Sequence, residues 1–274
     1  MIEKLLFTTA AAHHLENDVI SESWARMRDR NKDWKIILFS DSQQEQFLRE
    51  RLSPRVFKAY QSINPSYGAA RADFFRYCAC FLLGGIYIDV KSHIAQPLNH
   101  LVRSDDQFLI SQWDNRPGQV HASTWGRHEE IDDVMGGEFI QWLIISRPKH
   151  PFLQAVIETV VSHIEAERQN SVVQAVGWKG VLKVTGPIAF TRAIANVIGD
   201  GTRFRNNQDY RYFNFWEHSC YYSIFEPSFM EQQVRGQGWK LLDEGSANAW
   251  HRLCVEKHYS RNVEPVVLPL KSID

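Results

Sequence analysis

The sequence predicts an α/β fold in which helices flank a mostly parallel sheet. In residues 1–100, short apolar segments alternate with helical segments, which is the pattern of parallel strands joined by helices. A Gly-Gly pair joins the longest of these helices directly to an apolar strand. No internal repeat and no low-complexity linker divides the sequence, so we expect residues 1–274 to form a single domain.

Each element of residues 1–100 follows from its pattern. The first helix has Val19, Trp24 and Met27 on one side, and Ser53-Pro54 ends the second helix. Segment 34–40 is apolar and is expected to be a buried strand. The expected elements are strand 4–9, helix 18–31, strand 34–40, helix 42–52, helix 65–85 and strand 86–90.

The third helix leads to the most informative part of the sequence. Pro65-Ser66 supplies an N-terminal signal, and Gly84-Gly85 is a common way to end a helix. The following strand carries Asp89 at its carboxyl end. Because ligands of open parallel sheets bind beyond those ends, we expect a binding site at Asp89.

The rest of the sequence is less regular. Residues 111–138 mix turn residues with aromatic ones and predict long loops, and residues 257–262 belong to a polar tail. The expected elements are strand 139–146, helix 150–167, a turn and helix at 185–194, and aromatic strands around 210–216 and 220–225.

The composition excludes several classes of protein. With 31 basic and 32 acidic residues the net charge is -1, so no overall field attracts nucleic acid. The four cysteines form no disulfide framework, and Cys78-x-Cys80 lies within the helical segment, so we expect no zinc site. The motifs of zinc proteases, serine hydrolases and P-loop proteins are absent from the sequence.

The N-terminal segment MIEKLLFTTAAAHH imitates a signal peptide. Its apolar run contains two threonines and leads directly into a helix, so we expect a first strand and a cytoplasmic protein. We find no run of the about 20 apolar residues that a membrane span needs.

Charged residues of both signs are expected to converge at one strand end. Asp73 and Arg76 are three residues apart and share a helix face, and this helix runs into the strand of Asp89. An ordinary surface ion pair is the alternative, but the apolar neighbours favour a partly buried, functional pair. Lys91, beside a fixed acid, is a candidate partner for a diphosphate.

The segment RADFFRYCACFLLGGIYIDV resembles the DXD-containing sugar transferases of glycosyltransferase family 32, which are related to the large clostridial glucosylating toxins. The matching features are the Asp-x-x-Arg-Tyr helix, the Gly-Gly-Ile-Tyr turn and the acidic motif. Weaker similarities lie at SWARMRDRNKDWKIILFSD, SRPKHPFLQAVI, TGPIAFTRAI and KHYSRN.

This resemblance implies a GT-A fold, a UDP- or GDP-sugar donor and transfer with retention of configuration. Residues 1–100 would bind the donor, and residues 101–274 would form a loop-rich acceptor side and a C-terminal tail. Asp73 and Arg76 would bind hydroxyls of the donor sugar, and Gln141 would lie near it. The other implied donor-binding residues are Thr8, Thr9, Ser40, Asp41, Tyr67, Arg71, Asp89, His258 and Ser260.

The sequence departs from the family at its second acid, which is Lys91 here, so the motif reads Asp-Val-Lys. Manganese and magnesium prefer several oxygen ligands, and an ammonium group repels them. In one account Lys91 replaces the metal and neutralises the leaving diphosphate. In a second, Asp89 and His258 still hold a metal. In a third, catalysis has been lost.

For the acceptor we expect a glycan or glycolipid, bound by the loops between Asp105 and Glu138. The candidate acceptor-binding residues are Trp113, Trp125, Glu129, Glu130 and Trp142. Solvated loops with packed tryptophans are the alternative. The expected function is hexose transfer to a glycan in surface-polysaccharide or glycolipid synthesis, with peripheral contact to a membrane-bound acceptor. The rivals are a catalytically silent protein that binds sugar nucleotides or glycans, and an effector that glycosylates a host protein.

Overall fold

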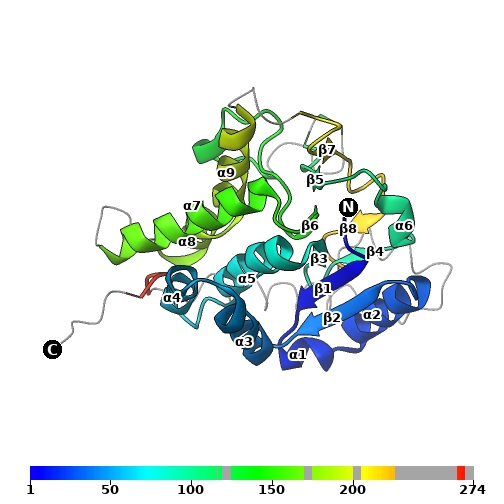
Figure 1. The fold of residues 1–274 in the computed structure, drawn as a ribbon, viewed down its shortest axis with the longest axis horizontal. Helices are drawn as coiled ribbons and strands as arrows, with labels where there is room; N and C mark the ends of the chain where they lie inside the picture. Colours follow the sequence, from blue (N-terminus) through cyan, green and yellow to red (C-terminus); the bar gives the residue numbers. More distant parts are fainter. Residues whose placement is uncertain (116, 119–124, 170–174, 200–204, 226–263, 269–274) are drawn as a thin grey trace.

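A computed structural model of the chain describes residues 1–115, 117–118, 125–169, 175–199, 205–225 and 264–268. It confirms the predicted α/β fold, with a sheet of six strands in the order β2-β1-β3-β6-β5-β7 (Figure 1). These strands are β1 (Leu5–Thr9), β2 (Lys35–Phe39), β3 (Gly85–Ile88), β5 (Phe108–Ile110), β6 (Leu143–Ser146) and β7 (Arg211–Tyr212). A smaller sheet pairs β4 (His93–Ile94) with β8 (Cys220–Tyr221).

The direction of β6 determines which residues meet at the binding edge of the sheet. Strand β1 is parallel to both β2 and β3, but β6 runs antiparallel to β3 and to β5. The start of β6 therefore lies beside the carboxyl end of β3. Gln141 and Trp142, which immediately precede β6, are brought to the same edge as Asp89.

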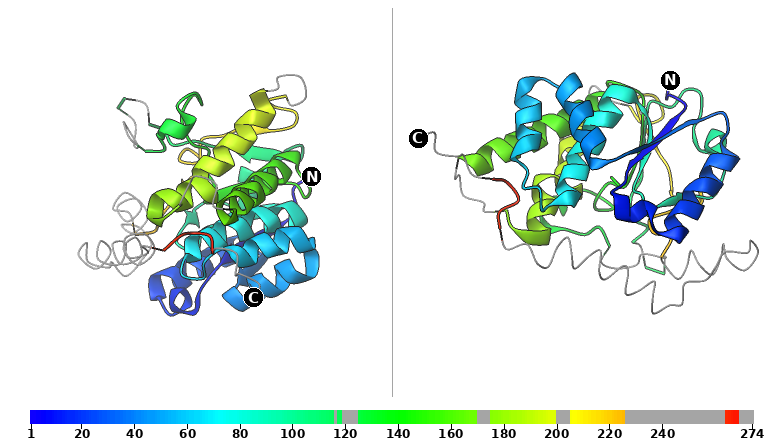
Figure 2. Two further views of the ribbon diagram at one scale, coloured as in Figure 1. Left: turned by 90° about the vertical axis from the view of Figure 1, so that its left-hand side faces the viewer. Right: turned by 90° about the horizontal axis from the view of Figure 1, so that it is seen from below.

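Helices cover both faces of the sheet (Figure 2). On β1, Phe7 belongs to an apolar cluster with side chains of α5 and α7, whereas the adjacent Leu6 belongs to a second cluster with side chains of α2. Neighbouring residues of a strand point to opposite faces, so both faces are buried. The helices are α1 (Ala12–Leu15), α2 (Asp18–Arg30), α3 (Asp41–Arg51), α4 (Pro54–Ser62), α5 (Gly68–Leu83), α6 (Leu98–Leu101), the 3-10 helix η1 (Glu129–Ile131), α7 (Pro151–Arg168), α8 (Gly177–Val184) and α9 (Pro187–Gly199).

The Gly-Gly turn between α5 and β3 fixes the position of Asp89. Gly84 and Gly85 have φ values of 66° and 88°, a region that glycine adopts readily. A Cβ atom on Gly84 would lie 2.5 Å from Pro148 Cδ, and one on Gly85 would collide with the carbonyl oxygen of Leu5. The predicted helix end is therefore confirmed, and only glycine fits it.

Some details of the predicted elements were wrong. Ser66 does not cap α5; its N–H and hydroxyl both donate to Asn64 Oδ1. Strand β2 is only partly buried, because it is at the edge of the sheet and no further strand covers its outer side in the described chain. Helix α3 ends before Ser53-Pro54 as predicted, but Pro54 also begins α4, since proline suits the first position of a helix. The aromatic segments 210–216 and 220–225 contain only the short strands β7 and β8.

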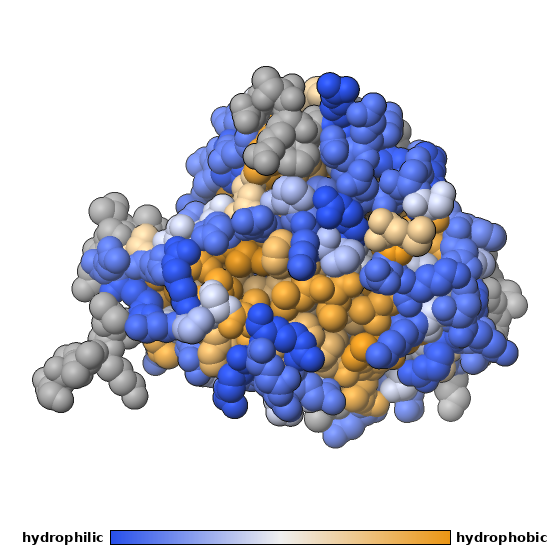
Figure 3. Space-filling model, in the orientation of Figure 1, coloured by the Kyte–Doolittle hydropathy of each residue, from blue (hydrophilic) through white to orange (hydrophobic). Residues whose placement is uncertain are grey.

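One apolar segment and one apolar surface bear on membrane contact. Segment Gly177–Gly199, which contains α8 and α9, is long and apolar enough to cross a membrane by length and composition, but 61% of its apolar window is buried inside the protein. Figure 3 shows apolar side chains gathered in the middle of the face seen in Figure 1, over α5 and the strands beside it. Peripheral contact with a membrane stays a prediction.

Candidate active site

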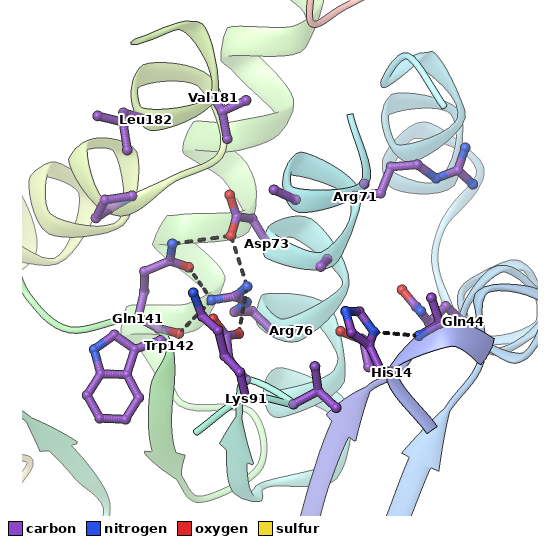
Figure 4. A pocket seen from close by; sticks show the side chains of 18 of the residues that line it. His14, Gln44, Arg71, Asp73, Arg76, Lys91, Gln141, Trp142, Val181 and Leu182 are labelled. Atoms are coloured by element: carbon purple, nitrogen blue, oxygen red, sulfur yellow. Dashed lines mark hydrogen bonds and ion pairs between the residues drawn. The ribbon is translucent and has the colours of Figure 1, made fainter. Parts of the chain in front are cut away.

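A cleft of about 1370 Å³ lies at the carboxyl ends of β1 and β3 (Figure 4). Its walls come from α1, α3, α5, α8 and the loops before β6, so segments from both halves of the chain contribute. The sequence-predicted residues that line it are Thr9, Asp41, Arg71, Asp73, Arg76, Asp89, Lys91, Trp113, Trp125, Gln141 and Trp142.

Arg76 connects the charged residues of the cleft. Its Nη2 lies 3.1 Å from Asp73 Oδ1 and 3.0 Å from Asp89 Oδ1. Its Nη1 donates to the side-chain and backbone oxygens of Gln141 at 2.9 and 3.1 Å. The side chains of Arg76 and Asp73 are only 6% and 5% exposed. This is a buried network, and the surface ion pair that was the alternative is excluded.

Burial and neighbouring charges both shift the pKa values of this network. The pKa of Asp73 is raised to about 6, mainly by burial. The charge of Asp89 also raises this pKa, whereas the charge of Arg76 lowers it. Gln141 Nε2 and Thr185 Oγ1 donate to Asp73 at 3.2 and 3.1 Å, which favours its ionised form. Burial lowers the pKa of Arg76, but Asp89 and its other anionic neighbours outweigh burial and the pKa is raised. The guanidinium stays charged and holds two carboxylates.

Asp89 is the acid of the network that a ligand can reach. Its carboxylate is 21% exposed, and its Oδ1 accepts a hydrogen bond of 2.9 Å from the Tyr87 hydroxyl. Its backbone N–H donates to the Trp142 carbonyl at 2.9 Å. Arg76 also lies over the Tyr87 ring, 4.8 Å from its centroid. Asp89 is thus held from both sides and keeps a face toward the cleft.

Two tyrosines of the network were missed by sequence reasoning. Tyr87 precedes Asp89 by two residues, so the strand period could have placed both on one face. Tyr77 is one helical turn after Asp73, and its hydroxyl lies 2.9 Å from Gln141 Oε1 and 2.8 Å from the Thr185 carbonyl oxygen. Both were obscured by the apolar residues around them, which made them resemble ordinary core side chains.

Lys91 lies against an aromatic wall. Its Nζ donates to the Tyr222 hydroxyl at 3.1 Å and lies 4.4 Å from the centroid of that ring. The Tyr222 ring in turn contacts Trp113 and Trp142, with centroid distances of 5.4 and 5.5 Å. Tyr222 was not predicted, because nothing in its local sequence shows that the loop returns to the cleft.

The described residues do not fit a divalent cation at the Asp-Val-Lys motif. They contain no group of three or more His, Cys, Asp or Glu side chains that could hold a metal. Asp89 Oδ1 is already paired with the cationic Arg76, and Lys91 brings a second positive charge to the same cleft. His258 and Ser260, which we expected near the diphosphate, lie outside the described residues.

Several predicted residues lie elsewhere. Thr8 is fully buried in β1. Ser40 caps α3 in a capping box with Gln43, so its hydroxyl serves the helix. The Tyr67 side chain is buried, and its hydroxyl donates to the Glu264 carbonyl at 2.6 Å, in the described segment 264–268. Glu129 and Glu130 are in η1, outside the cleft lining, and Glu130 pairs with Lys183 at 2.5 Å.

Comparison with known proteins agrees with this arrangement. Residues 18–108, which extend from α2 past Asp89 and Lys91 to β5, match the family described as "Glycosyltransferase sugar-binding region containing DXD motif". This segment resembles a sugar-binding region of glycosyltransferases. The match covers the helix of Asp73 and Arg76 and the strand before Asp89.

One curated protein and one solved structure resemble a larger part of the chain. The initiation-specific alpha-1,6-mannosyltransferase of Candida albicans is 26% identical over 202 residues, which are 69% of this chain and 51% of that protein. The chain thus spans about half the length of this curated relative. The solved structure of PaToxG glycosyltransferase matches this chain with a TM-score of 0.50 and 14% sequence identity. The match covers 94% of this chain and 86% of the PaToxG chain. At that identity the likeness concerns the fold alone, which is of the expected GT-A type.

Proposed function

We propose that this chain is a glycosyltransferase that moves a hexose from a UDP- or GDP-sugar to a glycan acceptor. The observation that carries the proposal is the buried Arg76, held between Asp73 and Asp89 at the carboxyl end of β3. It lies inside the segment that matches the sugar-binding region. A buried guanidinium with two carboxylates needs a reason beyond stability, because such pairs add little net stability.

In this proposal Asp89 binds the donor directly. Its carboxylate, which is 21% exposed, accepts hydrogen bonds from hydroxyls of the sugar or the ribose. Arg76 acts through the carboxylates, because its Nη atoms already bond Asp73, Asp89 and Gln141. Thr9, Asp41 and Arg71 line the part of the cleft beside α3 and would surround the nucleoside.

For the leaving group we favour Lys91 as the neutralising cation. As the bond between the anomeric carbon and the phosphate oxygen breaks, negative charge develops on the diphosphate. A preorganised donor at such a charge contributes about 3 kcal/mol. By the resemblance to family 32, Lys91 takes the place of an acid. The Tyr222 hydroxyl accepts a hydrogen bond from its ammonium group, and both residues line the cleft. The alternative, a metal held by Asp89 and His258, needs a residue outside the described part of the chain.

We propose transfer with retention by front-face attack. The acceptor hydroxyl attacks the anomeric carbon on the face that the diphosphate leaves, and its proton passes to a leaving phosphate oxygen. A double displacement would need a carboxylate nucleophile near the anomeric carbon. Asp73 and Asp89 are both held by Arg76, which disfavours that role. We further propose a cytoplasmic enzyme of surface-polysaccharide or glycolipid synthesis.

The test is hydrolysis and transfer with a panel of UDP- and GDP-sugars, each with manganese, with magnesium and with chelator. Release of nucleoside diphosphate from one donor supports the proposal. Nucleotide binding without turnover of any donor would favour the silent binding protein, for which Lys91 in the acidic motif is the specific argument. Mass shifts on lysate proteins, with no transfer to glycans, would favour the effector.

A further inference from the structure

We propose that Glu138 and Trp125 form the acceptor subsite, and that its ligand is a sugar ring with two neighbouring free hydroxyls. This inference rests on the proposed function and deepens it. The sequence predicted Glu129 and Glu130 as acceptor-binding acids, but both lie outside the cleft lining. Glu138 lines the cleft, and we assign this role to it instead.

The Glu138 carboxylate is held on both oxygens. Its Oε1 accepts from Trp113 Nε1 at 2.5 Å, and its Oε2 lies 2.7 Å from His128 Nε2. The side chain is 12% exposed, so it is mostly buried but reaches the cleft. Each carboxylate oxygen can accept a second hydrogen bond. The two oxygens can therefore receive the hydroxyls of one diol without moving.

Trp125 supplies an apolar face beside this carboxylate. It lines the same cleft and is 45% exposed, which is unusual for a tryptophan. Its ring contacts Trp113, with centroids 5.0 Å apart, and Trp113 is the donor to Glu138. The C–H face of a sugar ring stacks on such a surface while its hydroxyls turn toward the acid. Aromatic walls with a few fixed polar groups are typical of ligand sites.

The loop that carries both residues is closed on itself. The Glu138 N–H donates to the Gly126 carbonyl at 2.8 Å. Asn115 Nδ2 donates to the carbonyls of Trp125 and Gly136 at 3.1 and 3.0 Å. Gly126 has a φ of 69°, and a Cβ there would lie 2.8 Å from Glu138 Cγ. Because this geometry is preorganised, little ordering entropy is lost when a ligand binds.

The subsite adjoins the proposed donor site. Trp113, which donates to Glu138, packs edge-on against Tyr222, and Tyr222 accepts from Lys91 at 3.1 Å. Along the chain, Gln141 follows Glu138 by three residues and bonds Asp73 and Arg76. A sugar on Trp125 would therefore present a hydroxyl toward the region between Gln141 and Lys91.

The arrangement favours a carbohydrate over a protein acceptor. A serine or threonine side chain has one hydroxyl, which would use one carboxylate oxygen, and it has no ring face that could stack on Trp125. A sugar uses both features at once. The chemistry of the site is therefore that of a glycan acceptor, whether free or attached to a lipid.

Glu138→Gln is the central variant, because it keeps the shape and removes one acceptor oxygen and the charge. With a panel of oligosaccharides we expect the acceptor KM to rise at least tenfold, while donor hydrolysis and donor KM stay unchanged. Trp125→Ala should raise the acceptor KM in the same way. Glu158→Gln is the matched control, because it removes an exposed carboxylate that pairs with Arg55 outside the cleft. It should leave the acceptor KM, the donor KM and donor hydrolysis unchanged.

Sugar binding to the donor-free protein, measured by isothermal titration calorimetry, keeps the inference separate from the proposed function. If wild type hydrolyses no donor but binds oligosaccharides, and Glu138→Gln and Trp125→Ala lose this binding, the proposed function fails and the subsite stands. Wild-type affinity or acceptor KM in both variants would overturn the subsite. Transfer to peptides, by a protein that neither binds sugars nor transfers to them, would also overturn the subsite.

Discussion

Arg76 and Asp89 form an ion pair of 3.0 Å between helix α5 and the end of strand β3, the two elements that the Gly-Gly turn joins. The same guanidinium reaches Asp73 on its own helix and Gln141 before β6. A single buried cation thus sets the relative positions of three segments of the cleft.

Asp89→Asn should abolish donor hydrolysis while leaving the protein folded. The amide keeps the shape of the side chain but loses the charge that pairs with Arg76 and accepts donor hydroxyls. We expect a loss of about 10²-fold or more, as for removal of one preorganised group at a reacting centre. Hydrolysis rate and thermal midpoint are measured together. Asp33→Asn, on an exposed acid paired with Lys4, is the control. Donor hydrolysis within threefold of the wild-type rate would show that Asp89 does not bind the donor.

Arg76→Met should destabilise the fold strongly. The substitution is similar in length but leaves Asp73 and Asp89 without their buried counter-charge. Breaking a buried pair in this way costs about 3 to 5 kcal/mol. Urea unfolding gives the free energy of unfolding directly. Arg49→Met, at an exposed pair with Glu45, should cost less than about 1 kcal/mol. Equal effects of the two substitutions would show that the network at Arg76 is not coupled to stability.

The pairing of Asp73 with Arg76 could be predicted from sequence because it is local: two residues three apart on a helix of apolar residues. Gln141 was found only through the family resemblance. Glu138 and Tyr222 could not be found, since they reach the cleft through loops that lack regular periodicity. The antiparallel direction of β6 was equally hidden, because a buried apolar strand has the same pattern in either direction. Local sequence pattern therefore predicted the side of the cleft that α5 and the end of β3 form. The side that Glu138 and Tyr222 form depends on loops that return from distant parts of the sequence.

Lys91 makes metal dependence a direct test of the leaving-group proposal. If its ammonium neutralises the diphosphate, wild type should turn over donor in chelator. Lys91→Met should lose about 10²-fold in rate, and Lys91→Arg should keep most of it, because the charge is retained. Lys91→Asp should be inactive in chelator but recover with manganese, since it supplies a second carboxylate ligand. Strict manganese dependence of wild type would reject the proposal and favour a metal held by Asp89.

Asp73 should give the stability of the protein a specific pH dependence. Its pKa is raised from 3.8 to about 6 by burial, which outweighs the opposing effect of Arg76. Between these values the folded state binds more protons at Asp73 than the unfolded state, so this residue makes stability fall as pH rises from about 4 to 6. The contribution is favourable below pH 4 and fully lost above pH 6.

Two buried histidines change stability in the opposite direction over the whole of this pH range. Burial lowers the pKa of His93 to about 3 and that of His150 to about 4, so they make stability rise as pH increases toward 6.5. The effect of Asp73 is therefore isolated as a difference between wild type and Asp73→Asn. Urea unfolding at half-unit steps from pH 4 to 7 should show the wild-type free energy falling relative to the variant up to pH 6 and level above it. A difference that is flat, or that rises with pH, would mean that Asp73 is ionised throughout and that Arg76, Gln141 and Thr185 outweigh its burial.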